Sequence, residues 1–115
     1  MRFLKALFGA RPAVIPKDSV TVHFKLSDNK FGSREERDRV HQFSHELEAL
    51  IQQCQVGEFD GDEFGGGEGT LFMYGPDADL LFEAVSSALK NWEPLRGGHV
   101  IKSYGKSGRS VRIEF

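Results

Sequence analysis

Hydrophobic residues after Pro16 follow two different periods, and the order of these periods limits the fold more than any other feature of the sequence. Apolar residues first alternate with polar ones, at Val20, Val22, Phe24 and Leu26. Apolar residues then recur at steps of three or four between Val40 and Cys54. A period of two is typical of a strand with one buried face, whereas steps of three and four are typical of an amphipathic helix.

Local signals place the ends of the first helix. Ser33 and Glu36 have the spacing of a capping box, so we expect the helix to follow Ser33 directly. Its apolar stripe comprises Val40, Phe43, Leu47, Leu50, Ile51 and Cys54. Gly57 lies just beyond its end. Because Cys54 continues the stripe, we expect its thiol to be buried and unreactive.

The second half of the chain predicts two hairpins around a second helix. Residues 56–75 form the first hairpin, with a glycine turn within residues 65–69. Asp77 and Asp79 place negative charge at the start of the second helix, where free backbone amides favour it. Its apolar stripe comprises Leu81, Val85, Ala88, Leu89 and Trp92, and Pro94 ends it. Residues 99–104 and 111–115 flank a GKSG turn and form the last hairpin.

The resulting order is strand, helix, strand, strand, helix, strand, with one additional carboxyl-terminal strand. This order predicts an α+β fold, a ferredoxin-like βαββαβ plait in which two helices cover one face of an antiparallel sheet. A chain of 115 residues is expected to have one core, so residues 17–115 form a single domain. Residues 1–16 form a separate amphipathic or flexible segment. Its first nine residues fold back onto the domain, fray, or form a weak anchor to a membrane surface or a partner.

Charge is divided unevenly along the chain. The stretch from His41 to Leu89 has no lysine or arginine, and all fifteen basic residues lie on either side of it. An acidic, glycine-rich hairpin occupies its centre, with Glu58, Asp60, Asp62, Glu63 and Glu68. These carboxylates favour a basic protein partner, because complementary charge increases the association rate and the specificity. They disfavour nucleic acid, because they repel phosphate.

The segment DGDEFGGGEGTLFMYGPDAD at residues 60–79 resembles a segment of small uncharacterised bacterial proteins. The resemblance implies no activity and transfers no site residues. A single cysteine is consistent with a reducing compartment, so we expect a cytoplasmic location. No apolar run approaches the roughly 20 residues that a membrane-spanning helix needs.

The strand TLFMY at residues 70–74 is apolar on both sides. Leu71 and Met73 point one way, and Phe72 and Tyr74 point the other, because side chains alternate across a sheet. One pair packs under the helices and the other lies on the open face of the sheet. In the plait this strand lies beside the first strand, so the open face also carries Thr21, His23 and Lys25. A second subunit, a ligand or residues 1–16 would cover that face, and a homodimer is the leading interpretation.

Candidate metal sites are incomplete. Asp60, Asp62 and Gly65 match three positions of a calcium loop, but Leu71 stands where that loop needs a glutamate. His41 and His45 have the spacing of a zinc pair, yet they lie on the helix face opposite the apolar stripe, where no third ligand is expected. We therefore expect no metal and no cofactor.

Two classes of function follow from these patterns. The first is a non-catalytic interaction or regulatory module that dimerises through its sheet and presents the acidic hairpin to a partner. The second is a small-molecule-binding or enzymatic plait with a pocket on the open face, where His23 could transfer a proton beside Phe72 and Tyr74. A catalytic role for His23 needs a second polar partner that the sequence does not identify.

Overall fold

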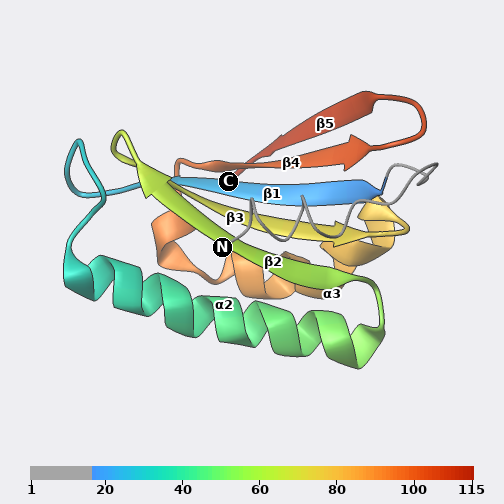
Figure 1. The fold of residues 1–115 in the computed structure, drawn as a ribbon, viewed down its shortest axis with the longest axis horizontal. Coiled ribbons are helices and arrows are strands. Elements are labelled where there is room, and N and C mark those ends of the chain that lie inside the picture. Colours follow the sequence, from blue (N-terminus) through green and yellow to red (C-terminus); the bar gives the residue numbers. More distant parts are fainter. Residues whose placement is uncertain (1–16) are drawn as a thin grey trace.

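A five-stranded antiparallel sheet organises the computed structural model, which describes residues 17–115 (Figure 1). The elements are, in order, β1 (Asp18–Lys25), α2 (Arg34–Cys54), β2 (Glu58–Gly65), β3 (Glu68–Gly75), α3 (Ala78–Lys90), the short 3-10 helix η1 (Glu93–Leu95), β4 (His99–Tyr104) and β5 (Arg109–Glu114). The predicted α+β class, with two α-helices and an antiparallel sheet, is confirmed. The predicted amphipathic segment at residues 1–16 and its membrane contact lie outside the described residues.

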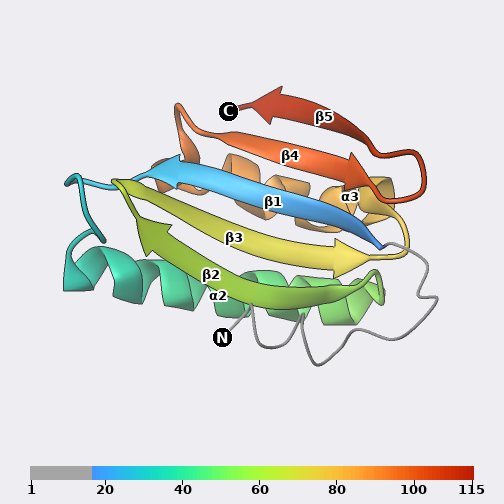
Figure 2. The same cartoon turned by 45° about the horizontal axis from the view of Figure 1, so that its top comes forward.

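The strands lie in the order β2-β3-β1-β4-β5, so the first strand of the chain is at the centre of the sheet. Both helices lie on one face, and the opposite face carries no helix of the described residues (Figure 2). Val22 of β1 lies opposite Leu71 of β3 and Val100 of β4, and all three are fully buried. The core therefore occupies the layer between the sheet and the helices.

Helix α2 begins as its capping box predicts. The Ser33 hydroxyl accepts a hydrogen bond from the Glu36 backbone amide at 3.1 Å, and the Glu36 carboxylate accepts one from the Ser33 amide at 2.7 Å. The prediction for Cys54 is wrong, because its side chain is exposed. Helical spacing places Cys54 on the side of Leu47, but the last buried residue of α2 is Ile51. Burial thus ends one turn before the helix does.

Helix α3 is shorter than predicted. Asp77 caps it by accepting hydrogen bonds from the amides of Asp79 and Leu80. The helix ends at Lys90, so Trp92 lies beyond it and Pro94 belongs to η1. Trp92 still packs on the core, where its ring stacks on Phe43 with centroids 4.2 Å apart.

Asp18 joins three parts of the fold at one end of the sheet. Its two carboxylate oxygens accept hydrogen bonds from the backbone amides of Ala78 and Gly105, each at 2.9 Å. The start of β1, the first turn of α3 and the turn between β4 and β5 are therefore held together. Asp79 adds a second link from α3 to β4, because it accepts hydrogen bonds from Lys102 and Tyr104.

The glycines of the β2–β3 hairpin have packing roles. At the turn, the Gly67 amide donates to the Lys30 carbonyl, and the Leu26 amide donates to the Gly67 carbonyl, each at 2.9 Å. A Cβ at Gly69 would lie 2.4 Å from the Phe24 ring, which crosses β3 at that position. The hairpin is thus packed against β1 and the loop that follows it.

We predict that Gly69→Ala lowers the free energy of unfolding by about 2 kcal/mol, because the added methyl must displace the buried Phe24 ring. Gly65→Ala, in the same hairpin, is the matched control. A Cβ at Gly65 meets nothing within 4 Å, so its effect should stay within about 0.5 kcal/mol. Urea unfolding of both variants checks the prediction, and equal losses in both would contradict it.

Candidate functional site

The open face of the sheet brings together most of the residues that the sequence singles out. Leu71 and Met73 are buried under the helices, so Phe72 and Tyr74 lie on the open face. Strand register places Thr21 between Phe72 of β3 and Ile101 of β4. On the same face His23 lies between Thr70 and His99, and Lys25 lies opposite Glu68.

A pair of histidines lies at the middle of the sheet's width. His23 of β1 and His99 of β4 are cross-strand partners, and their rings stack with centroids 4.6 Å apart and planes within 10°. The Thr21 hydroxyl lies 2.9 Å from His23 Nε2, and the Thr70 hydroxyl lies 3.4 Å from His23 Nδ1. His23 therefore has hydroxyl groups within reach of both ring nitrogens, and its side chain is only 19% exposed.

The surroundings of His23 favour its neutral form. Burial lowers the pKa of His23 below its ordinary value of 6.5, and the neighbouring His99 lowers that pKa further. The carboxylate of Glu68, 3.7 Å from His23 Nδ1, acts in the opposite direction, while Arg112 acts in the same direction as His99. Desolvation and the second imidazole together outweigh the carboxylate, so His23 is neutral at pH 7.

The five carboxylates of the acidic hairpin do not share one surface. Glu58, Glu63 and Glu68 belong to the open face, because their register partners are Tyr74, Thr70 and Lys25. Asp60 lies at a bulge between Phe59 and Gly61 and is 8% exposed. Asp62 lies on the helix side, opposite the buried Leu71. An acidic surface on the open face therefore includes three of the five predicted residues.

His41 has a neighbour that the sequence did not predict. Its side chain is 54% exposed, and it lies 3.3 Å from the Asp62 carboxylate and edge-on to the Phe64 ring. The reason is that α2 packs along β2, so this side of the helix faces the hairpin. His45 is exposed. Among residues 17–115, no three His, Cys, Asp or Glu side chains are arranged to hold a metal ion.

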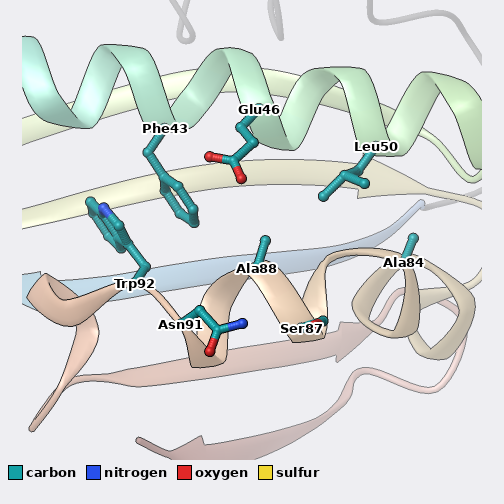
Figure 3. A pocket seen from close by; sticks show the side chains of 8 residues that line it. All are labelled: Phe43, Glu46, Leu50, Ala84, Ser87, Ala88, Asn91 and Trp92. Atoms are coloured by element: carbon teal, nitrogen blue, oxygen red, sulfur yellow. The ribbon is translucent and has the colours of Figure 1, made fainter.

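A hollow of about 380 Å³ lies on the other side of the molecule, between α2 and α3 (Figure 3). Its lining residues are Phe43, Glu46, Leu50, Ala84, Ser87, Ala88, Asn91 and Trp92. Glu46 is the one ionisable residue among them, so the hollow offers no pair of groups for acid–base chemistry. The polar cluster around His23 is the stronger candidate site.

Sequence reasoning identified His23 but missed the partners that surround it. His99 and Thr70 are separated from His23 by more than forty residues, and Glu68 was assigned only to the acidic hairpin. Their proximity follows from the register of β1 with β3 and β4. In the sequence, the alternation of residues 99–104 indicates that His99 belongs to a strand. It does not indicate which strand lies beside it or in which register the two strands pair.

We predict that His23→Gln reduces the loss of stability between pH 8 and pH 5.5. With its pKa lowered, folded His23 binds a proton more weakly than unfolded His23, so stability falls as the pH drops through 6.5. The carboxyl groups of Asp28, Glu36, Asp79 and Glu114, whose pKa values are lowered, stay ionised in this range. Urea unfolding at both pH values provides the measurement. His45→Gln should retain the wild-type difference, and an unchanged difference in His23→Gln would refute the assignment.

No helix of residues 17–115 has the length and apolar character to cross a membrane. Comparison with protein-family models, with curated protein sequences and with solved structures finds no match for this chain. The candidate site is therefore defined by its own geometry, a stacked imidazole pair with two hydroxyl groups and a carboxylate on the open face of the sheet.

Proposed function

We propose that the protein is a non-catalytic interaction module that forms a homodimer through the open face of its sheet. The observation that carries this proposal is that both helices lie on one face of the sheet (Figure 2), while strand register places apolar side chains on the other. Phe72 and Ile101 flank Thr21 there, and Tyr74 lies two residues further along β3. A sheet with apolar residues on both faces is stabilised when both faces are covered.

The size of the face is sufficient for a specific dimer. Five strands spaced about 4.8 Å apart, each with about seven residues at about 3.3 Å, present roughly 550 Å². Two such faces would bury roughly 1,100 Å², just above the roughly 1,000 Å² expected of a specific interface. Isologous packing also suits the mixed charge of the face, because a two-fold axis can place Glu63 or Glu68 of one protomer beside Lys25 or Arg112 of the other.

The fold proposed for this module is a ferredoxin-like plait with an additional strand. Its support is the element order and the placement of both helices on one face. The strand order differs from that of a four-stranded plait because it includes a fifth strand, β5, at the edge of the sheet beside β4. This architecture hosts many unrelated activities, so it selects no function by itself. The cytoplasmic location stays a prediction.

A basic protein partner remains part of the proposal. Glu58, Glu63 and Glu68 lie on the open face, so a basic partner would compete with the second protomer for this surface. Charge reversal at Glu63 and Glu68 should therefore weaken such a complex more than reversal at Asp62, which lies on the helix side. Binding of a basic protein to each variant, measured by calorimetry, distinguishes the two surfaces.

The histidine pair favours a second candidate function, a small-molecule or enzymatic site on the same face. His23 is neutral at pH 7 and lies within reach of two hydroxyl groups, as a proton-transfer group would require. A small ligand also needs a concave surface around it. Shifts of the His23 and His99 proton resonances on addition of metabolites would support this candidate over the dimer.

We predict that the full chain is a dimer and that Ile101→Asp makes it a monomer, because a carboxylate at the centre of the interface would be desolvated without a partner. Leu80→Asp is the matched control. Leu80 is 53% exposed on α3, away from the open face, so this variant should remain a dimer. Light scattering on a size-exclusion column at about 100 µM protein gives the mass, and circular dichroism checks folding. A monomeric wild type, or a dimeric Ile101→Asp, would exclude this interface.

A further inference from the structure

The stacked histidines lie within the surface through which the proposed dimer forms. Strand β1 is the central strand of the sheet, and His23 projects from it beside His99 of β4. Within one protomer the side chain of His23 is already mostly buried, with 19% of its surface exposed. A second sheet packed on this face would remove most of the remaining water from both rings.

Charged groups reach the pair from each neighbouring strand. Glu68 approaches His23 from β3, and Glu63 of β2 lies one strand further out, opposite Thr70. On the other side, Glu114 of β5 lies opposite His99, and Arg112 follows on the same face opposite Ile101. Lys25, two residues from His23 on β1, lies opposite Glu68, and Glu58 lies further along β2 opposite Tyr74. Carboxylates and basic groups of the described residues thus surround the two imidazoles.

The carboxylates do not compensate fully for a protonated pair. Glu68 is 53% exposed at its side chain, so water screens its attraction to an imidazolium. The two imidazoles are less exposed than Glu68, and two positive rings stacked with centroids 4.6 Å apart repel. The lowered pKa of His23 agrees with this balance, since burial and His99 outweigh Glu68.

We propose that the His23–His99 pair makes assembly through the open face sensitive to protons, so that the protomers associate when the stacked pair is uncharged and separate when the pair takes up a proton. This inference rests on the proposed homodimer. Its physical basis is linkage: a species that binds protons more tightly is favoured as the pH falls, and the solvated monomer binds them more tightly than the dry interface.

The pH range of the effect follows from the same groups. The pKa of His23 is lowered from 6.5, so above that value His23 is neutral in monomer and dimer, and its protonation does not change the dissociation constant. Below the lowered pKa of His23, each released protomer takes up a proton. If one proton binds per protomer, the dissociation constant rises about 100-fold for each unit of falling pH.

The test is sedimentation equilibrium of the full chain at pH 8, 7, 6 and 5.5, with circular dichroism at each pH to confirm that the monomer is folded. The wild type should dissociate progressively below pH 6.5. The variant carrying both His23→Gln and His99→Gln should have a dissociation constant that changes less than about threefold across the range. His45→Gln, at an exposed position on α2, should retain the wild-type dependence.

The outcomes separate this inference from the proposed function. A wild-type dimer with the same dissociation constant at all four pH values would overturn the proton sensitivity and leave the dimer intact. A wild type that is monomeric at every pH would overturn the dimer, and the inference with it. Retained pH dependence in the double glutamine variant, or unfolding instead of dissociation at pH 5.5, would also refute the role of the pair.

Discussion

One-sided burial of the central strand is the constraint on which the rest of the structure depends. Val20, Val22 and Phe24 of β1 are buried between the sheet and the helices. Because successive side chains of a strand point to opposite faces, this burial places Thr21 and His23 on the open face. A slip of one residue would bury the imidazole and expose the valines, at a cost of several apolar side chains. The candidate site is therefore held in place by the core beneath it.

The acidic, glycine-rich hairpin has architectural roles in this fold. Gly69 has no side chain because the Phe24 ring occupies that space, and the Gly67 backbone bonds to the loop after β1. Asp60 is buried at a bulge, and Asp62 faces His41 of α2. The remaining acidic residues lie on the open face. The composition predicts one interaction surface, whereas the fold distributes these residues among packing, a contact between β2 and α2, and the open face.

The chemistry of the open face depends on an imidazole that is partly buried beside a second one. Burial of His23, together with the neighbouring His99, lowers the pKa of His23 and favours its neutral form. In the dimer that we propose, hydrophobic contact would supply the affinity and protonation of the pair would oppose it.

The sequence by itself determined the features that depend on neighbouring residues: the order of the strands and helices, the capping box of Ser33 and Glu36, and the side of β1 that carries His23. These follow from hydrogen bonds and side-chain periods within a few residues, which the sequence shows directly. Only the tertiary structure decided that Cys54 is exposed, that His41 meets Asp62, and that His99 stacks on His23. The physical reason is that helix docking and strand register are set by contacts between distant residues, and a local period is compatible with many such pairings.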